Sequence, residues 1–334
     1  MSIEFNRTVE EARFHNPLED FAEDAVEIEH RVDPLTGEQT RIVPMVFPRP
    51  EDGQPDIAAF VGDGEDCFFC PGNVEEATPT YPDFVGFDRG SAGEATSFPN
   101  LFPYAKHSNV VALTEDHFRP IGEFDAETVA DGLACALEYL HAVRDHEAVT
   151  FASVNMNILP SSGSSVVHPH LQTIADDHGS NEQRRTRRCE QAYHDDHGSS
   201  YWTDLRDRER DGPRHVGTTG DVEWIAPFAP THQWHVTGIT DVTGFPEPGD
   251  DVVDDLAAGI ENVLSYYADL GLNAHNFALS LSDDPASRAV IDVVARTPFD
   301  DHYVTDAYFH QILHNERVVD AVPEAYADDV GEYF

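Results

Sequence analysis

Two stretches of the chain have the apolar spacing of an amphipathic helix, and each lies between short segments that resemble strands. In the first stretch, Asp125 can cap a helix whose apolar residues recur at helical spacing as far as Val143. In the second, residues 251–270 place their apolar side chains on one face. Such a helix must bury its apolar face against another layer, and the neighbouring strands provide one. The pattern therefore predicts an α+β fold in which antiparallel sheets carry packed helices.

Both halves of the chain follow the order strands, helix, strands, helix. In the first half we expect strands at 98–103, 109–113 and 151–159 and a long polar helix at 181–210. In the second half we expect strands at 222–228, 234–239, 277–282 and 290–295 and a final helix at 306–319. Residues 1–66 are expected to be rich in loops, with a short strand at 41–47 and turns at 13–17 and 33–37. We predict two domains, residues 1–210 and residues 211–334.

The chain is strongly acidic: 63 Asp and Glu against 20 Lys and Arg give a net charge of −43. The acidic residues are spread along the whole chain. A content of 20 Phe and 11 Tyr, together with clear apolar periodicity, indicates a folded protein despite this charge. We therefore predict a halophilic protein in a salt-rich cytosol, because the Debye length falls to about 3 Å at 1 M salt. A nucleic-acid partner is not expected, since binding to phosphates needs a basic surface.

The sequence also suggests where the protein resides. No apolar stretch approaches the roughly 20 residues that a membrane span requires. The first residues, MSIEFNRTVEEARF, lack the pattern of a signal peptide. We therefore expect a cytoplasmic protein without a membrane partner. In that compartment a C-x-x-C pair is more often a metal-binding or redox site than a structural disulfide.

The stretch Ser161–Gln172, which reads SSGSSVVHPHLQ, contains two histidines separated by one proline. On an extended backbone His168 and His170 point to the same side, and Pro169 stiffens the chain between them. The small residues at 163–165 allow an anionic group to approach backbone amides. A nucleophilic imidazole beside phosphate-binding donors is suited to transfer of a phosphorus group. The chain has 18 histidines, so a chance surface pair remains the alternative.

A second cluster, Cys67-Phe68-Phe69-Cys70, lies far upstream. Two thiolates supply half of a tetrahedral zinc site, and histidines would have to complete it. The candidates at strand ends are His107, His117 and His168. The residues alone do not separate His107 from His117. A redox role for the cysteines is less favoured, because Pro71-Gly72-Asn73 does not open a helix as in thiol oxidoreductases.

Four segments together resemble the galactose-1-phosphate uridylyltransferase family of the histidine-triad superfamily. They are CFFCPGN at 67–73, SFP at 97–99, VVALTEDH at 110–117, and NMN with GSSVVHPHLQ between 155 and 172. They occur in the family's order, and a similar region follows at 202–224. The resemblance implies that each half of the chain is a histidine-triad-like unit with its own antiparallel sheet and packed helices.

The resemblance also implies roles for individual residues. The positions that match the family's zinc ligands are Cys67, Cys70, His117 and His168. His170 matches the nucleophile that becomes nucleotidylated, and Gln172 matches the glutamine that donates to the phosphoryl oxygens. The positions that match substrate-binding residues are Asn157, Gly163 and Ser165 at the phosphate and Phe68 and Phe69 at the base.

The implied reaction is exchange of UMP between UDP-hexose and a hexose 1-phosphate, as in galactose metabolism, through a covalent nucleotidyl-histidine. Glutamine at 172, where related hydrolases have a third histidine, favours transfer to another phosphate over hydrolysis. The expected partners are a nucleotide sugar and a sugar 1-phosphate, and family members often form homodimers that share the site.

The sequence departs from the family pattern in three places. Thr96 and Ser97 stand where the family usually has Asn-Asp at the ribose, and residues 290–298 lack the histidines of a second, iron site. The segment 303–316 matches the family's sugar-phosphate segment poorly. One alternative is therefore an adenylyltransferase or a phosphorylase acting on an ADP-sugar or a dinucleotide. Another is a zinc-stabilised nucleotide-binding module without turnover.

Overall fold

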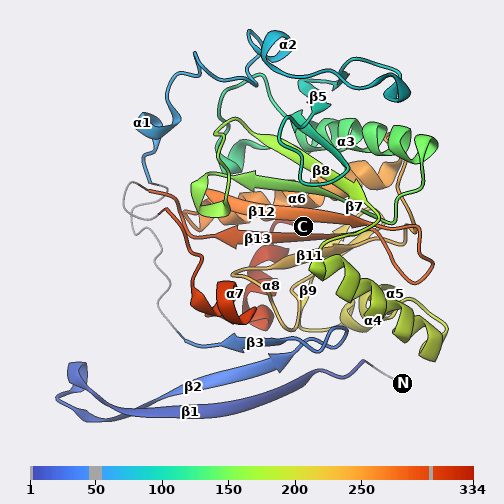
Figure 1. Ribbon diagram of the computed structural model, residues 1–334. Helices are drawn as coiled ribbons and strands as arrows, with labels where there is room; N and C mark the ends of the chain where they lie inside the picture. Colours follow the sequence, from blue (N-terminus) through green and yellow to red (C-terminus); the bar gives the residue numbers. More distant parts are fainter. Residues whose placement is uncertain (1–2, 45–54, 301–303) are drawn as a thin grey trace.

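The computed structural model describes residues 3–44, 55–300 and 304–334, and its frame is a large antiparallel sheet (Figure 1). The ten strands of this sheet are β4 (Gly90–Ala92), β5 (Ala95–Pro99), β6 (His107–Ala112), β7 (Phe151–Ile158), β8 (His170–Asp176), β9 (His215–Thr219), β10 (Val222–Ile225), β11 (Val236–Ile239), β12 (Ala274–Leu281) and β13 (Val290–Arg296). Their spatial order is β4-β5-β6-β8-β7-β12-β13-β11-β10-β9. The α+β prediction is confirmed.

Each half of the chain contributes five neighbouring strands to this sheet, and β7 and β12 join the halves by pairing with each other. Helix α3 (Ala126–His146) connects β6 to β7, and α6 (Asp251–Asp269) connects β11 to β12. The two helices pack side by side on one face of the sheet (Figure 1). The halves thus share one continuous sheet and repeat the same order of elements. The domain boundary at residue 210 stays a prediction.

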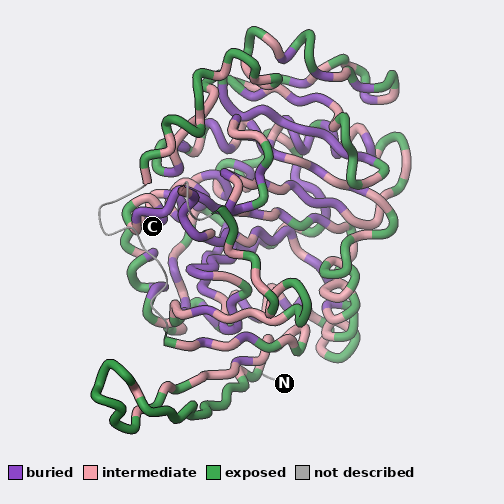
Figure 2. The backbone as a smooth tube through the Cα atoms, turned by 60° about the vertical axis from the view of Figure 1, so that its left-hand side comes forward, coloured by how far each residue is buried: buried purple, intermediate pink, exposed green. Residues whose placement is uncertain are grey.

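The large sheet has an apolar face and a polar face. Along β7, Val154 and Met156 are fully buried in the core with the apolar residues of α3 and α6. Because side chains alternate along a strand, Asn155 and Asn157 point to the opposite side. We call this side, which faces away from α3 and α6, the outer face. In Figure 2 most residues of the sheet's central strands are buried, whereas each of these helices alternates between buried residues and more exposed ones.

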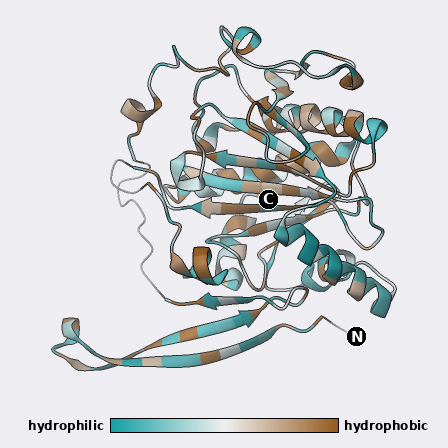
Figure 3. Cartoon of the chain, in the orientation of Figure 1, coloured by the Kyte–Doolittle hydropathy of each residue, from teal (hydrophilic) through white to brown (hydrophobic). Residues whose placement is uncertain are grey.

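Two further helices, α4 (Asn181–His197) and α5 (Tyr201–Glu209), cover part of the outer face in the C-terminal half. Tyr201 and Leu205 of α5 form a buried cluster with Ile225 and Ile239 of the sheet. Helix α4 is hydrophilic along most of its length (Figure 3). The single helix expected at 181–210 is wrong, because Gly198 adopts φ 74° and ends α4.

The N-terminal residues form a hairpin of β1 (Asn6–Asn16) and β2 (Ala22–Val32), which projects from the body and continues into β3 (Gln39–Ile42) (Figures 1 and 2). The expectation of a loop-rich segment with a turn at 13–17 is wrong. Strand β1 is exposed along almost its whole length and lacks the alternation of a half-buried strand, and β2 alternates only over residues 24–28. The turn at 33–37 is confirmed by a bond from Gly37 N to Asp33 O of 2.9 Å. Residues 45–47 of the strand expected at 41–47 lie outside the described residues.

The helix expected at 306–319 is also wrong. A short helix, α7 (Phe309–His314), ends at Asn315, which has φ 50°. The chain then forms β14 (Arg317–Val319), which pairs in parallel with β3 and completes a four-stranded sheet. A last helix, α8 (Pro323–Gly331), follows.

The remaining short elements are α1 (Ala58–Val61), α2 (Val74–Ala77), η1 (Pro17–Glu19), η2 (Asp83–Val85), η3 (Ile121–Glu123) and η4 (Pro160–Ser162). The other expected strands are present with shifted ends. For example, the strand expected at 98–103 is β5, which ends at Pro99. Within the described residues, no helix combines the length and apolar content needed to cross a membrane.

Candidate metal centre and active site

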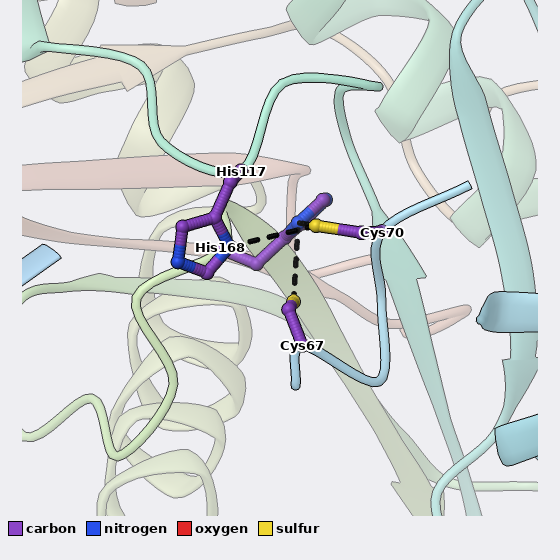
Figure 4. Close-up of side chains that lie close together, drawn as sticks. All are labelled: Cys67, Cys70, His117 and His168. Atoms are coloured by element: carbon purple, nitrogen blue, oxygen red, sulfur yellow. Dashed lines mark hydrogen bonds between the residues drawn. The ribbon is translucent and has the colours of Figure 1, made fainter. Parts of the chain in front are cut away.

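Two cysteines and two histidines from distant parts of the chain converge at one end of the N-terminal half (Figure 4). Their candidate ligand atoms all lie within 4.8 Å of one another. The Cys67 Sγ and the Cys70 Sγ each lie 3.6 Å from His168 Nδ1. The Cys70 Sγ also lies 3.5 Å from His117 Nδ1. All four residues predicted as metal ligands are therefore brought together, and His107 is not among them.

These distances match the donor set of a tetrahedral zinc site. With Zn–S of about 2.3 Å and Zn–N of about 2.0–2.1 Å, the edge joining a sulfur and a nitrogen ligand is about 3.6 Å. The three S···N distances given above have this length. Two soft thiolates with two imidazoles are also a ligand set that zinc favours. The residues fit a zinc ion.

Backbone carbonyls orient both histidine rings toward the sulfurs. His168 Nε2 donates to the Thr114 carbonyl at 2.9 Å, and His117 Nε2 donates to the Val61 carbonyl at 3.0 Å. With the proton on Nε2, each ring presents the Nδ1 lone pair to the centre of the cluster. The arrangement therefore fixes the tautomer that a metal ligand requires.

The loops that carry the ligands are held against each other. The Leu113 amide donates to the Pro169 carbonyl at 2.9 Å, which joins the end of β6 to the His168 segment. Gly64 has φ 76°, and a Cβ there would lie 2.7 Å from Cγ of His117. A side chain at Gly64 would therefore displace His117, so the close approach of this loop depends on glycine.

His170 begins β8 and points to the outer face of the sheet, next to the metal cluster. Its Nδ1 lies 2.8 Å from the His168 carbonyl and donates to it. The ring therefore keeps its Nε2 lone pair for a ligand or a nucleophilic attack. The same short segment, His168-Pro169-His170, thus supplies a candidate metal ligand and positions a candidate nucleophile.

Three of the other residues predicted for the site, Phe69, Asn157 and Gln172, lie near His170. The register of β7 and β8 pairs Asn155 with Gln172 and Met156 with Leu171, and its continuation by one residue brings Asn157 opposite His170, on the same face as Gln172. Phe69 packs on His170 with a centroid distance of 5.4 Å and joins a buried apolar cluster with Phe98. Phe68 is 65% exposed and forms part of the surface.

The loop between β7 and β8 places Gly163 and Ser165, both exposed, near the end of these strands. Leu159 enters the loop with φ 68° and ψ 162°, a strained backbone conformation for a residue with a side chain. Hydrogen bonds to the Leu159 carbonyl from Ser162 Oγ at 2.8 Å and from the Ser164 amide at 3.2 Å stabilise it. Strain of this kind concentrates at sites where the backbone must meet a ligand.

Burial changes the pKa of the clustered groups. Burial lowers the pKa of His168 to about 4, and it also lowers the pKa of His170. Burial and the hydrogen bond with Cys67 raise the pKa of the Cys70 thiol to about 12. The imidazoles are therefore neutral near pH 7, as a ligand and a nucleophile must be. A bound cation would reverse the shift of the thiol, because it stabilises the thiolate.

Several groups at the site were not predicted from the sequence. The carbonyls of Thr114 and Val61 orient the histidines, and Asn276 of β12 contacts Asn157. Backbone acceptors leave no signal in a sequence. The contact of Asn276 depends on the pairing of β7 with β12, and no local pattern reports it.

Solved structures with a similar fold cover nearly the whole chain. An ADP-glucose phosphorylase from Arabidopsis thaliana with bound ADP-glucose has a TM-score of 0.69 at 18% identity, covering 92% of this chain and 98% of that chain. A GalT-like protein from Arabidopsis thaliana has a TM-score of 0.68 at 18% identity, covering 91% and 98%. A uridylyltransferase has a TM-score of 0.66 at 18% identity, covering 91% and 97%. These likenesses establish a shared fold.

No family model matches the chain. A protein of Archaeoglobus fulgidus whose name is "Uncharacterized protein" is 34% identical over 308 residues, which are 91% of this chain and 92% of the relative. Identity at this level over nearly the full length of both proteins shows common descent. The chain therefore belongs to the same family as this archaeal protein, and it shares its fold with these solved structures.

Proposed function

We propose that the protein is a nucleotidyltransferase that exchanges UMP between UDP-hexose and a hexose 1-phosphate through a covalent nucleotidyl-His170. The observation that carries the proposal is the orientation of His170. Its Nδ1 proton is committed to the His168 carbonyl at 2.8 Å, so Nε2 faces the outer side of the sheet with a free lone pair. A nucleophile beside phosphate-binding donors is the arrangement that this reaction needs.

The reaction would proceed in two displacements. In the first, His170 Nε2 attacks the α-phosphorus of the nucleotide sugar, an N–P bond forms, and the bond to the bridging oxygen breaks. The sugar 1-phosphate leaves with that oxygen. In the second, a phosphate oxygen of another sugar 1-phosphate attacks the same phosphorus, and the N–P bond breaks. The second step returns His170 to its neutral form, so no external base is required.

Groups around His170 would bind the phosphates. Gln172 and Asn157 lie on the same face as His170, and their side-chain amides can donate to phosphoryl oxygens. Gly163 and Ser165 lie in the exposed loop that precedes β8, where backbone amides can approach an anion. Phe68 and Phe69 would pack on the base.

The cluster of Cys67, Cys70, His117 and His168 would hold a structural zinc ion. The four ligands fill a tetrahedral shell, and such closed sites stabilise folds rather than activate water. His168 is two residues from His170, and its ring would be fixed by the ion. The metal would therefore hold the His170 segment in place.

UDP-hexose is the preferred substrate because the motifs resemble those of galactose-1-phosphate uridylyltransferases. A specific observation supports a second candidate: the ADP-glucose phosphorylase with bound ADP-glucose has a TM-score of 0.69. An adenylyltransferase or phosphorylase that acts on ADP-sugars or dinucleotides would use the same nucleophile. The remaining alternative is a nucleotide-binding module that has no turnover.

The protein would act in galactose metabolism in a salt-rich cytosol, as a homodimer that shares the site. Light scattering of the purified protein at high KCl would test the dimer.

The decisive experiment uses UDP-glucose or ADP-glucose labelled with ³²P at the α-phosphorus, at high KCl. The proposal expects an acid-labile label on His170 from UDP-glucose and its release when galactose 1-phosphate is added. Label from ADP-glucose with release by inorganic phosphate would instead identify a phosphorylase. Nucleotide binding without any label on the protein would identify the binding module.

A further inference from the structure

A continuous chain of side-chain contacts runs across the outer face from the C-terminal half to the neighbour of His170. Asp306 and Arg296 form an ion pair in which Arg296 Nε lies 2.8 Å from Asp306 Oδ2. Arg296 Nη1 donates to Asn276 Oδ1 at 2.6 Å. Asn276 Nδ2 in turn donates to Asn157 Oδ1 at 2.5 Å.

The direction of every bond in this chain is fixed by chemistry. A guanidinium has no acceptor, so the atom of Asn276 that faces Arg296 must be its oxygen. Its amide nitrogen must then face Asn157, and Asn157 must present its own oxygen to Asn276. The carboxylate of Asp306 holds Arg296 in place by accepting from it. An amide that could rotate freely in isolation therefore has one orientation here.

This orientation determines what Asn157 offers to the candidate site. With Oδ1 bound to Asn276, the Asn157 amide turns its Nδ2 group away from β12. Within the described part of the chain, this Nδ2 group has no hydrogen-bond partner, and the strand register places its residue opposite His170. A phosphoryl oxygen needs a donor beside the nucleophile, and the fixed orientation supplies one.

We propose that Asn276 and Arg296 are positioning residues of the transfer reaction, which act by holding the Asn157 amide with its donor toward the phosphate. This inference rests on the proposed function, because it assigns the phosphoryl group as the acceptor for Asn157. Asn276 and Arg296 themselves do not touch the reacting atoms. Residues of the C-terminal half would thereby determine that Asn157 presents a donor, and not an acceptor, to the phosphate.

Asn276 also supports the loop before β8, since its Nδ2 group lies 3.0 Å from the Ser162 carbonyl. A test must therefore separate support of the loop from control of Asn157. Asn276→Ala and Asn276→Asp both remove the bond to Ser162. They differ in their effect on Asn157, because an aspartate has two acceptors and draws the donor group of Asn157 toward itself.

The expected order of rates follows from this difference. At saturating nucleotide sugar, N276A should slow nucleotidylation of His170 by about tenfold, because Asn157 can then rotate. N276D should slow it by about 10²-fold, the effect of losing one oriented donor at a transition state. A purely structural role predicts that Asp, which has nearly the shape of Asn and retains the bond to Arg296, is the milder change.

Two further variants control for charge and test rescue. Ala278→Asp places the same charge on the same strand and face, but opposite Asn155 instead of Asn157. It should raise the KM for the nucleotide sugar and keep the maximal rate within about threefold. Arg296→Lys retains a group that only donates and should stay within about threefold of the original rate, whereas Arg296→Met should lose about tenfold.

The inference is overturned if N276D is no slower than N276A, or if A278D lowers the maximal rate as much as N276D does. A readout independent of turnover is the side-chain NH₂ signal of Asn157 in protein labelled with ¹⁵N-asparagine. Its exchange with water should be fast in the original protein and slow in N276D, where the introduced carboxylate accepts from it. If the original protein forms no nucleotidyl-His170, the proposed function fails, and this exchange measurement still decides whether Asn276 orients Asn157.

Discussion

The two halves of the large sheet place different side chains at equivalent positions on the outer face. Asn155 of β7 pairs with Ala278 of β12, and a two-fold relation about this pair exchanges β8 with β13. Met156 pairs with Leu171, and the equivalent residue Leu279 pairs with Ile291. The equivalent pairs on the outer face are therefore His170 with Val290, Gln172 with Asp292, and Asn157 with Ser280.

The polar groups of the C-terminal half are bound to each other. Asp292 Oδ1 accepts from His235 Nε2 at 2.9 Å and from Thr237 Oγ1 at 2.7 Å. About half of the Asp292 side-chain surface, 48%, remains exposed and faces a cavity of about 210 Å³ beneath α4 and α5. At the equivalent of His170, Val290 offers an apolar side chain that is 4% exposed.

This difference shows how a repeated order of strands and helices can carry different polar groups in its two halves. In the N-terminal half, the His168 carbonyl accepts a hydrogen bond from His170 Nδ1, and His170 Nε2 stays available beside the candidate metal cluster. In the C-terminal half, the equivalent strand carries no nucleophile, and its aspartate is occupied by a histidine and a threonine. The reactivity of a polar side chain on this face would therefore depend on whether its hydrogen-bonding atoms already have a partner within the protein.

Substitutions of His170 and of its equivalent Val290 should differ most in their effect on turnover. His170→Ala should reduce turnover by about 10³-fold or more and abolish the ³²P label, because the N–P bond cannot form. Val290→Ala should retain turnover and lose only about 1–2 kcal/mol of stability from a small cavity. Single-turnover assays and denaturant titrations measure the two effects. Equal losses of turnover in both variants would contradict the assignment of His170.

Substitutions in the metal cluster should have the next largest effect, on zinc content and on stability. Cys67→Ser or Cys70→Ser should lose bound zinc and several kcal/mol of unfolding free energy, because metal binding contributes directly to folding. Cys189→Ser is the matched control, since Cys189 lies outside the cluster. Elemental analysis and thermal melts measure both quantities. Retention of zinc in the variants at 67 and 70 would rule out this cluster as the metal site.

Substitutions of Gln172 and of its equivalent Asp292 test the two halves at a position next to that of the nucleophile. Gln172→Ala should slow nucleotidyl transfer by about 10²-fold, because a donor to the phosphate is lost. Asp292→Asn should leave transfer nearly unchanged and destabilise the protein by about 1–2 kcal/mol, since it weakens a bond to His235. The rates come from single-turnover assays and the stabilities from denaturant melts. A larger kinetic effect at Asp292 would reverse the proposed division between the halves.

Salt should act on both halves alike. Transfer from high KCl to dilute buffer should lower the melting temperature, because the net charge of −43 is then less screened. Thermal melts over a series of KCl concentrations measure this. H170A should respond as the original protein does, which separates the effect of solvent from that of the site. A melting temperature independent of KCl would contradict the halophile prediction.

The sequence predicts elements whose pattern is local. Helices α3 and α6 follow from apolar spacing, and most strands follow from alternation or apolar runs. The hairpin of β1 and β2 escapes prediction because its residues bury little of either face. Strand β14 escapes it because its partner β3 lies far away in the sequence, and the apolar content of this segment suits a helix equally well.

The candidate site shows the same limit. Spacing alone does not separate His107 from His117, because both lie near the ends of β6. In the structure, His107 lies at the start of the strand and bonds to Glu147 at 2.5 Å, whereas His117 reaches the cysteines. The resemblance to known motifs indicates the right histidine. It gives no sign of Asn276, whose contact with Asn157 spans 119 residues of sequence.

The pairing of β14 with β3 affects the order in which segments of the chain can fold during translation. Arg31, 1% exposed, binds Glu324 at 2.8 Å, and Arg41 binds Glu316 at 2.6 Å, so these contacts span 293 and 275 residues. The nascent hairpin can meet the carbonyls of Phe228 and Pro230 earlier, but it cannot complete its contacts until residues 316–324 have left the ribosome. Its many acidic side chains would keep this early segment hydrated and disfavour association with other nascent chains during that delay.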